Sequence, residues 1–109
     1  MIIKIFDELN NESATLPQQG DQIYKLIYTE LKKDFETNEN YTEELIFNFS
    51  KIDDLTTAFL NNCLGKLFYD FPYEYLMNNI KFENLTNNSQ VKSIRLTLSN
   101  ALMNIKKNN

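Results

Sequence analysis

The residues of this sequence that could carry chemistry gather in one short polar stretch near its middle. Asp53 and Asp54 stand side by side, and Thr56 and Thr57 follow them. Paired carboxylates can act as a general acid and a general base, and Tyr69 could assist them. Carboxylate pairs are also common in turns, where they cap helices. Because no catalytic motif accompanies this pair, we expect a protein that is not an enzyme.

Other chemistry-bearing residue types are scarce. The chain contains one cysteine, Cys63, and no histidine. A catalytic thiol is usually activated by a nearby base such as histidine, which is also the commonest metal ligand. With no second cysteine, no disulfide can form within the chain, which suits a reducing compartment. The chain also lacks an apolar run of ~20 residues that would span a membrane. We therefore expect no metal site, no cofactor, no membrane partner and a cytoplasmic location.

The charge is unevenly distributed along the chain. The net charge is −4, but residues 1–54 carry 12 acidic and 5 basic side chains, whereas residues 55–109 carry 3 acidic and 6 basic ones. Nucleic-acid binding needs clustered Lys and Arg that release counterions, so this balance argues against a nucleic-acid partner. The acidic half is either a set of solvated helix faces or a patch that steers a basic protein partner.

A strand, a turn and an amphipathic helix are expected to position the polar stretch. Residues 45–49 are apolar on both faces except Asn48, as expected of a central strand covered on both sides. Thr56 or Thr57 can cap the following helix, which must end near Pro72. The apolar positions of this helix recur at helical spacing, and they are Leu60, Cys63, Leu64, Leu67, Phe68 and Phe71.

The remaining segments continue the alternation of strand and helix. Asp21 can cap a first helix that runs to about Phe35, and a last helix begins near Ser89. The expected order is β-α-β-α-β-α, which predicts an α/β fold: a single small domain over residues 1–109, with a mostly parallel sheet of three or four strands packed by helices. The expected strands are residues 1–6, 44–49 and 80–83. We expect a polar loop over residues 7–19 and a short helical turn over residues 73–79. The apolar stripe of the last helix consists of Val91, Ile94, Leu98, Leu102 and Ile105.

These residues resemble a known pattern. Phe47-Asn48-Phe49-Ser50-Lys51-Ile52 is similar to the hydrophobic-Asp-Phe-x-x-Val strand end of STAS-like domains. Thr57-Ala58-Phe59 resembles the start of the central helix in the bacterial STAS-like domain family of unknown function, and Gly65-Lys66-Leu67 resembles its interior. The segment from 80 to 91 extends the similarity, which covers about residues 20–105. This family is related to the STAS domains of anti-sigma factor antagonists.

The resemblance implies a protein-binding role and a possible modification site. In STAS antagonists, a Ser or Thr at the start of the central helix is phosphorylated by a partner kinase. Thr57 falls on that position, and Thr56 stands where an Asp usually precedes it. Both threonines can equally be helix caps. The chain also departs from the family pattern, because Asn61 and Asn62 replace an Asp-Glu pair, so the role of those charges does not carry over.

We therefore expect a non-catalytic regulatory module that acts as a switch or antagonist on a partner protein. The resemblance implies a kinase-like ATPase or an anti-sigma factor as the partner. Two alternatives remain: an inhibitor encoded by a phage or mobile element, and a small domain that binds an anion or nucleotide at the helix N-terminus. A Gly-rich loop is absent, which disfavours the latter. The expected partner-binding residues are Ser50, Asp53, Asp54, Thr56, Thr57, Asn61, Asn62 and Lys66.

Overall fold

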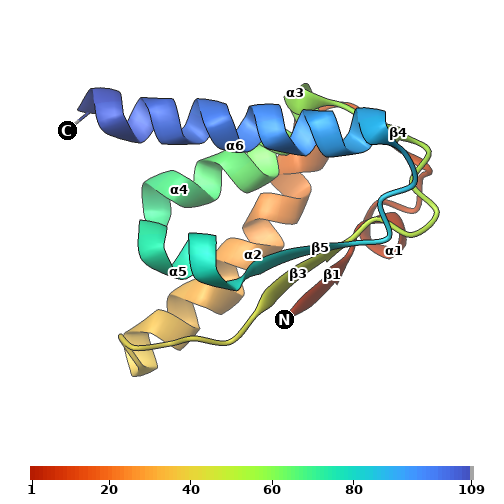
Figure 1. Ribbon diagram of the computed structural model, residues 1–109. Helices are drawn as coiled ribbons and strands as arrows, with labels where there is room; N and C mark the ends of the chain where they lie inside the picture. Colours follow the sequence, from red (N-terminus) through yellow and green to blue (C-terminus); the bar gives the residue numbers. More distant parts are fainter. Residues whose placement is uncertain (109) are drawn as a thin grey trace.

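Three short parallel strands form the main sheet of the molecule. The computed structural model describes residues 1–108, and the strands are β1 (Ile2–Lys4), β3 (Leu45–Asn48) and β5 (Ile80–Glu83). Their order is β1-β3-β5, so β3 lies in the centre (Figure 1). The register places Phe47 beside both Ile3 and Phe82. The predicted α/β fold with a mostly parallel sheet is therefore confirmed.

A second, two-stranded parallel sheet lies beyond the carboxyl end of β3. It pairs β2 (Ser13–Ala14) with β4 (Asp54–Leu55). The prediction of a polar loop over residues 7–19 was incomplete, because this segment also contains most of α1 (Ile5–Leu9), the strand β2 and the start of the next helix. Strands of two residues are too short for alternation to reveal them. The pairing of β2 with β4 is what fixes the polar stretch in space.

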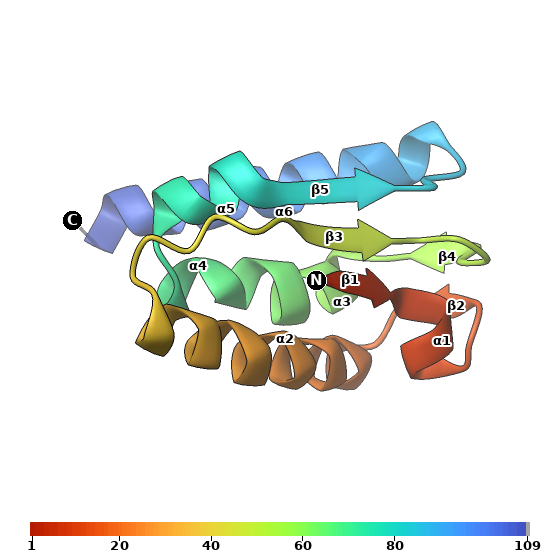
Figure 2. The same ribbon diagram turned by 90° about the horizontal axis from the view of Figure 1, so that it is seen from below.

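The helices pack against one face of the main sheet. Figure 2 looks onto the opposite face, and β5 there lies in front of α6. The helices beyond α1 are α2 (Pro17–Thr37), α3 (Thr57–Leu60), the π-helical turn η1 (Asn61–Gly65), α4 (Lys66–Asp70), α5 (Tyr73–Asn79) and α6 (Asn88–Asn108). No helix within residues 1–108 is long and apolar enough to cross a membrane.

One face of the sheet carries the core and the other is open. Leu45 and Phe47 are fully buried, whereas Ile46 and Asn48, which alternate with them, are only half-buried. Ile2, beside Ile46 on the same face, is 60% exposed. The prediction that the central strand is covered on both sides was therefore wrong. Ile46 caused the error, because an apolar residue on the open face gives the strand the sequence pattern of a strand buried on both faces.

The first long helix begins earlier than predicted. Pro17 is its first residue, a position that suits the fixed φ of proline and its missing N–H. The Gln19 side chain accepts hydrogen bonds from the N–H groups of Thr15 and Leu16, at 2.9 and 3.0 Å. The N-cap residue is Leu16. The prediction that Asp21 caps this helix was wrong, since Asp21 lies inside it.

Gly20 allows the close crossing of α2 and α3. A Cβ atom at Gly20 would lie 2.3 Å from the Phe59 carbonyl oxygen and 2.8 Å from the Asn62 Cβ. Backbone and Cβ atoms cannot move aside as the end of a flexible side chain can. The residue therefore fixes how closely the two helices approach, rather than marking the end of a loop.

The central helix follows its predicted stripe. Thr56 is the N-cap and the helix stops before Pro72, with Phe71 already extended. The turn over residues 61–65 is π-helical, which the apolar spacing does not reveal. The helix at 73–79 and the strand at 80–83 are confirmed, and the last helix starts at Asn88. The buried residues of the central helix are Phe59, Leu60, Cys63, Leu64, Leu67, Phe68 and Phe71.

Candidate functional site

The connection from β3 to α3, residues 50–57, is the candidate site, and we call it the β3–α3 turn. It begins at the carboxyl end of the central parallel strand, the edge at which α/β sheets commonly bind ligands. The Asn48 carboxamide accepts a hydrogen bond from the Ser50 N–H at 2.9 Å. Lys51 has a φ of 68°, in the left-handed region, so the chain reverses sharply there. Ile52 is fully buried and anchors the turn.

Strand β2 holds the turn on one side. The Asp53 N–H donates at 2.8 Å to the carbonyl of Glu12, the residue before β2, and the Thr56 N–H donates to the Ala14 carbonyl of β2 at 3.2 Å. The Ser13 hydroxyl lies 3.2 Å from an Asp54 carboxylate oxygen, to which it donates. The polar backbone of the turn is therefore paired rather than left to water.

Helix α6 holds the turn on the other side through Gln90. This side chain is only 2% exposed, and its Nε2 donates to the Ile52 carbonyl at 3.0 Å. Its Oε1 accepts from the Thr86 N–H at 2.9 Å. The sequence analysis missed Gln90 because its stripe on α6 was chosen from apolar residues and began at the neighbouring Val91. The residues of α6 that are buried are Gln90, Ile94, Thr97 and Ala101.

The two threonines have different surroundings. The Thr56 hydroxyl accepts from the Phe59 N–H at 3.3 Å and donates its single proton to the Thr15 carbonyl at 2.8 Å. It is therefore fully occupied as a helix cap. Thr57 is half-buried at the first helical position, and within residues 1–108 its hydroxyl makes no hydrogen bond. Of the two candidate phosphoacceptors, Thr57 has the hydroxyl that is not already committed.

The residues farther along the helix face different neighbours. The Asn62 carboxamide donates to the Pro17 carbonyl at 3.3 Å, and Lys66 Nζ lies 2.6 Å from Asp21 Oδ1. This hydrogen bond with Lys66 lowers the pKa of the Asp21 carboxyl. Asn61 instead lines a groove of 420 Å³ against α6. Ser50, Asp53 and Asp54 are exposed at the turn itself. The structure thus gathers the turn residues, while Asn62 and Lys66 lie toward α2.

A small polar pocket lies beside the turn. It has a volume of 210 Å³ and includes Lys4, Asn48 and Asn84 from the carboxyl ends of the three parallel strands, together with Lys51. Asn84 Nδ2 donates to Asn48 Oδ1 at 3.1 Å. Asp7 also lines the pocket, so its charge partly offsets that of the two lysines. Such a pocket suits a small polar or anionic group.

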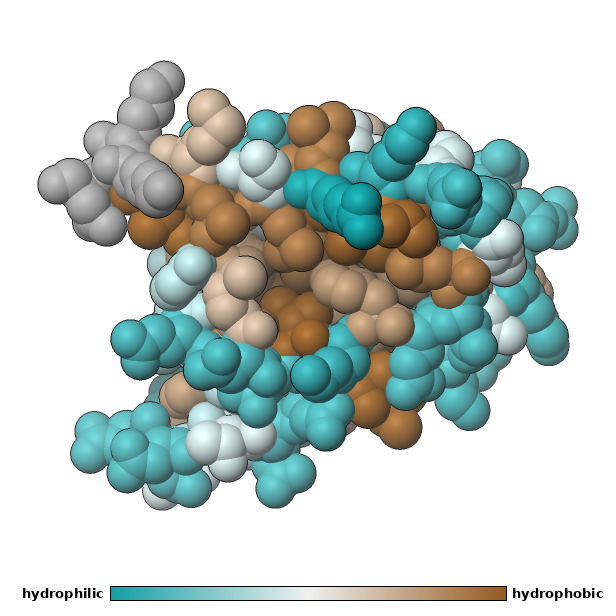
Figure 3. All heavy atoms as spheres, in the orientation of Figure 1, coloured by the Kyte–Doolittle hydropathy of each residue, from teal (hydrophilic) through white to brown (hydrophobic). Residues whose placement is uncertain are grey.

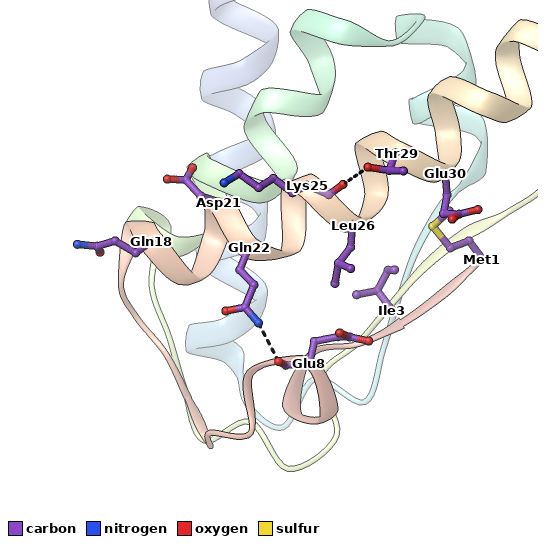
Figure 4. A pocket seen from close by; sticks show the side chains of 10 residues that line it. All are labelled: Met1, Ile3, Glu8, Gln18, Asp21, Gln22, Lys25, Leu26, Thr29 and Glu30. Carbon is purple, nitrogen blue, oxygen red and sulfur yellow. Dashed lines mark hydrogen bonds between the residues drawn. The ribbon is translucent and has the colours of Figure 1, made fainter.

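A larger pocket lies elsewhere, between β1, α1 and α2. It has a volume of 810 Å³, and Figure 4 shows Leu26 of α2 and Ile3 of β1 directed toward each other across it. Gln22 Nε2 donates to the Glu8 carbonyl at 2.9 Å at one end. Its charged lining mixes acidic side chains with Lys25. This arrangement provides no nucleophile with an adjacent base.

The chemistry available to the only cysteine is limited. Cys63 is fully buried, and this burial raises the pKa of its thiol to about 12. The reactive thiolate form is therefore essentially absent at neutral pH. Within the described residues, no group of three or more His, Cys, Asp or Glu side chains is placed to hold a metal ion.

Comparison with known proteins identifies the family of the chain. Residues 19–90 match the model of a family described as a STAS-like domain of unknown function (DUF4325). No match was found among curated proteins or among solved structures. The matched segment extends from α2 to the start of α6, so it contains the β3–α3 turn and the central helix. The chain belongs to this family of STAS-like domains.

Proposed function

We propose that this protein is a non-catalytic interaction module that acts as a switch or antagonist on a partner protein. The partner meets the β3–α3 turn, and its class is a kinase-like ATPase or an anti-sigma factor. The observation that carries the proposal is the fixed geometry of the turn. Its backbone is hydrogen-bonded to β2 on one side and to Gln90 on the other, while Ser50, Asp53 and Asp54 are exposed on it.

A fixed turn favours recognition for an energetic reason. A partner that binds a flexible loop must offset the entropy of ordering it, whereas a preorganised surface carries little of that cost. The exposed carboxylates of Asp53 and Asp54 can steer a basic surface on the partner. Such steering raises the association rate more than the affinity.

Thr57 provides the switch in this proposal. A phosphate on its hydroxyl would lie at a helix N-terminus, where backbone N–H groups favour negative charge. The nearby carboxylates of Asp53 and Asp54 would repel the same phosphate. Phosphorylation would therefore change the charge of the surface that the partner meets, and it would do so at a half-buried position where added bulk must displace neighbouring atoms.

Binding and phosphate transfer test the proposal together. Wild-type protein, Thr57→Glu and the control Thr42→Glu, exposed in the loop before β3, are titrated calorimetrically with a purified kinase-like ATPase of the same genome. We expect Thr57→Glu to weaken binding at least tenfold, roughly 1.4 kcal/mol, and Thr42→Glu to bind like wild type. Equal affinity for all three proteins would reject the turn as the binding surface. Phosphate incorporated with ATP should be lost in Thr57→Ala and retained in Thr56→Ser.

A second candidate function is the binding of a small anion in the pocket beside the turn. The observation that favours it is the pair of lysines that line this pocket, Lys4 at the carboxyl end of β1 and Lys51 in the β3–α3 turn. Titration with inorganic phosphate, followed by amide chemical shifts, tests this function. Shifts confined to the pocket that disappear in Lys51→Met would support it, and the absence of shifts at millimolar phosphate would reject it.

A further inference from the structure

Within residues 1–108, no strand pairs with the outer edge of β5. β5 is the last strand of the sheet, and Figure 1 shows no other segment in front of it. The Phe49 N–H donates to the Glu83 carbonyl at 3.0 Å, so the backbone groups of Glu83 point toward β3. Successive residues of a strand direct these groups to opposite edges, so those of Phe82 point outward. The Phe82 N–H and C=O are therefore available to another strand.

An apolar band lies beside this open edge. Figure 3, in the orientation of Figure 1, shows hydrophobic side chains gathered around a hollow between α6 and β5. The sequence analysis identified an apolar stripe on α6, and in the structure the stripe residues other than Ile94 are only half-buried. The half-buried apolar residues of the two elements are Ile80, Phe82, Val91, Leu98, Leu102 and Ile105.

The charges of β5 are arranged so that the strand complements itself. Lys81 and Glu83 flank Phe82, and both side chains are exposed on the open face of the sheet. When two copies of this strand run antiparallel about Phe82, Lys81 of each copy lies opposite Glu83 of the other. A parallel arrangement in register would instead place like charges side by side, which is destabilising.

We propose that this protein forms a two-fold symmetric homodimer through β5. Phe82 of each copy exchanges both backbone hydrogen bonds with Phe82 of the other, and the two sheets join into one of six strands. Two Lys81–Glu83 pairs form across the axis, and the apolar bands of β5 and α6 cover each other. Such a self-complementary contact is the usual form of a dimer interface. This interface is separate from the β3–α3 turn, so the proposal does not rest on the proposed function.

Sedimentation velocity of the full chain over a wide concentration range tests the proposal. We expect a reversible dimer of twice the 12.9 kDa chain mass. Lys81→Glu and Glu83→Lys should each raise the dimer dissociation constant about tenfold, because each places two like-charged pairs across the axis. The double charge swap restores opposite charges and should recover the wild-type constant within about threefold. The control is Lys33→Glu at an exposed site on α2, which changes the net charge as much as Lys81→Glu does and should leave the dimer dissociation constant unchanged.

Three results would overturn the proposal. The first is a chain that stays monomeric at every concentration. The second is a dimer that the double charge swap does not restore, and the third is a dimer that Lys33→Glu weakens as much as Lys81→Glu does. Amide hydrogen exchange gives a second readout that needs no variant. The Phe82 amide should exchange more slowly as the protein concentration rises, whereas the Lys81 amide, which faces β3, should show no comparable change.

Discussion

The two ends of this molecule are held together by different kinds of contact. At the end with the β3–α3 turn, directional hydrogen bonds join backbone groups to β2 and to the buried Gln90. At the opposite end, aromatic rings from α2, the loop before β3 and α5 pack around Phe35. Hydrogen bonds fix position and angle, whereas apolar packing tolerates small shifts. The contrast indicates that the chain fixes geometry at the turn and gains general stability from the aromatic end.

The aromatic end is a connected set of rings. The Phe35 ring lies 5.0 Å from that of Tyr75, 5.5 Å from that of Tyr41 and 5.8 Å from that of Phe71, measured between centroids. The Tyr75 hydroxyl donates to the Glu43 carbonyl at 2.8 Å. Edge-to-face and tilted pairs at these distances contribute beyond their buried area. This end therefore stabilises the fold without presenting a fixed polar geometry.

The largest effect on the turn end is expected from Gly20→Ala. The new Cβ would lie 2.3 Å from the Phe59 carbonyl, so α2 and α3 must separate. We expect a loss of about 3 kcal/mol in the free energy of unfolding, measured by urea denaturation. Gly65→Ala is the matched control, because its nearest atom would be 3.9 Å away. That change should stabilise the helix by roughly 0.5–1 kcal/mol. Equal destabilisation by both changes would contradict the role given to the crossing.

Gln90→Ala should loosen the turn while leaving the aromatic end intact. The change leaves the Ile52 carbonyl and the Thr86 N–H without their partner, which costs about 1–3 kcal/mol. Amide chemical shifts should move in residues 50–57 and stay unchanged around Phe35. Gln18→Ala, at an exposed position, is the control and should change stability by less than about 0.5 kcal/mol. If the chemical-shift changes caused by Gln90→Ala were equally large at both ends of the molecule, the turn end and the aromatic end would not be structurally independent.

The aromatic end should be the more sensitive to alkaline pH. Burial, followed by the Asp34 carboxylate, raises the pKa of Tyr41 from its ordinary 10.0 to about 12. The pKa values of Tyr24 and Tyr75 are also raised, with burial as the largest cause. Because the unfolded chain releases the Tyr41 proton first, the stabilisation from Tyr41 is complete below pH 10.0 and is lost as pH rises through 12. Denaturation midpoints measured across this range should fall, and Tyr41→Phe should reduce the fall. A midpoint independent of pH would contradict this expectation.

The smallest effect is expected from the ion pair that links the central helix to α2. Lys66 and Asp21 have side chains 43% and 41% exposed, so solvent screens their attraction. Lys66→Ala should lower the free energy of unfolding by no more than about 1 kcal/mol. Thermal melts beside the control Lys33→Ala provide the measurement. A loss as large as that of Gly20→Ala would mean that charge, rather than close approach, joins these helices.

The sequence predicted the elements with strong periodicity and missed those that depend on distant partners. Phe47 on β3 and Leu64 on the central helix were both expected in the core, because a short apolar run and helical spacing mark them directly. The strand at Ser13–Ala14 exists because Asp54–Leu55 lies beside it, and no local pattern encodes that pairing. Asp21 has the residue type of a helix cap, but its carboxylate pairs with Lys66 instead.

The candidate site was predicted in location but not in its internal roles. Either Thr56 or Thr57 could be the helix cap in the sequence, and the hydrogen bonds of Thr56 with the Phe59 N–H and the Thr15 carbonyl assign that role to Thr56. Gln90 lies 38 residues along the chain from Ile52, to which it donates, and its neighbour Val91 had the more apolar side chain. A polar side chain is buried when it forms a hydrogen bond with a buried backbone group. The sequence does not indicate which backbone groups are buried without a backbone partner, so only the structure identifies such a side chain.

Native-state amide hydrogen exchange tests the central claim, a preformed β3–α3 turn, most directly. In the free protein, the Asp53 and Thr56 amides should be protected nearly as strongly as those of the core strand β3, because they donate to Glu12 and Ala14. The Thr42 amide, in the exposed loop before β3, should exchange orders of magnitude faster. If Asp53 and Thr56 exchange as fast as Thr42, the turn is not preformed, and its proposed role as a fixed recognition surface is wrong.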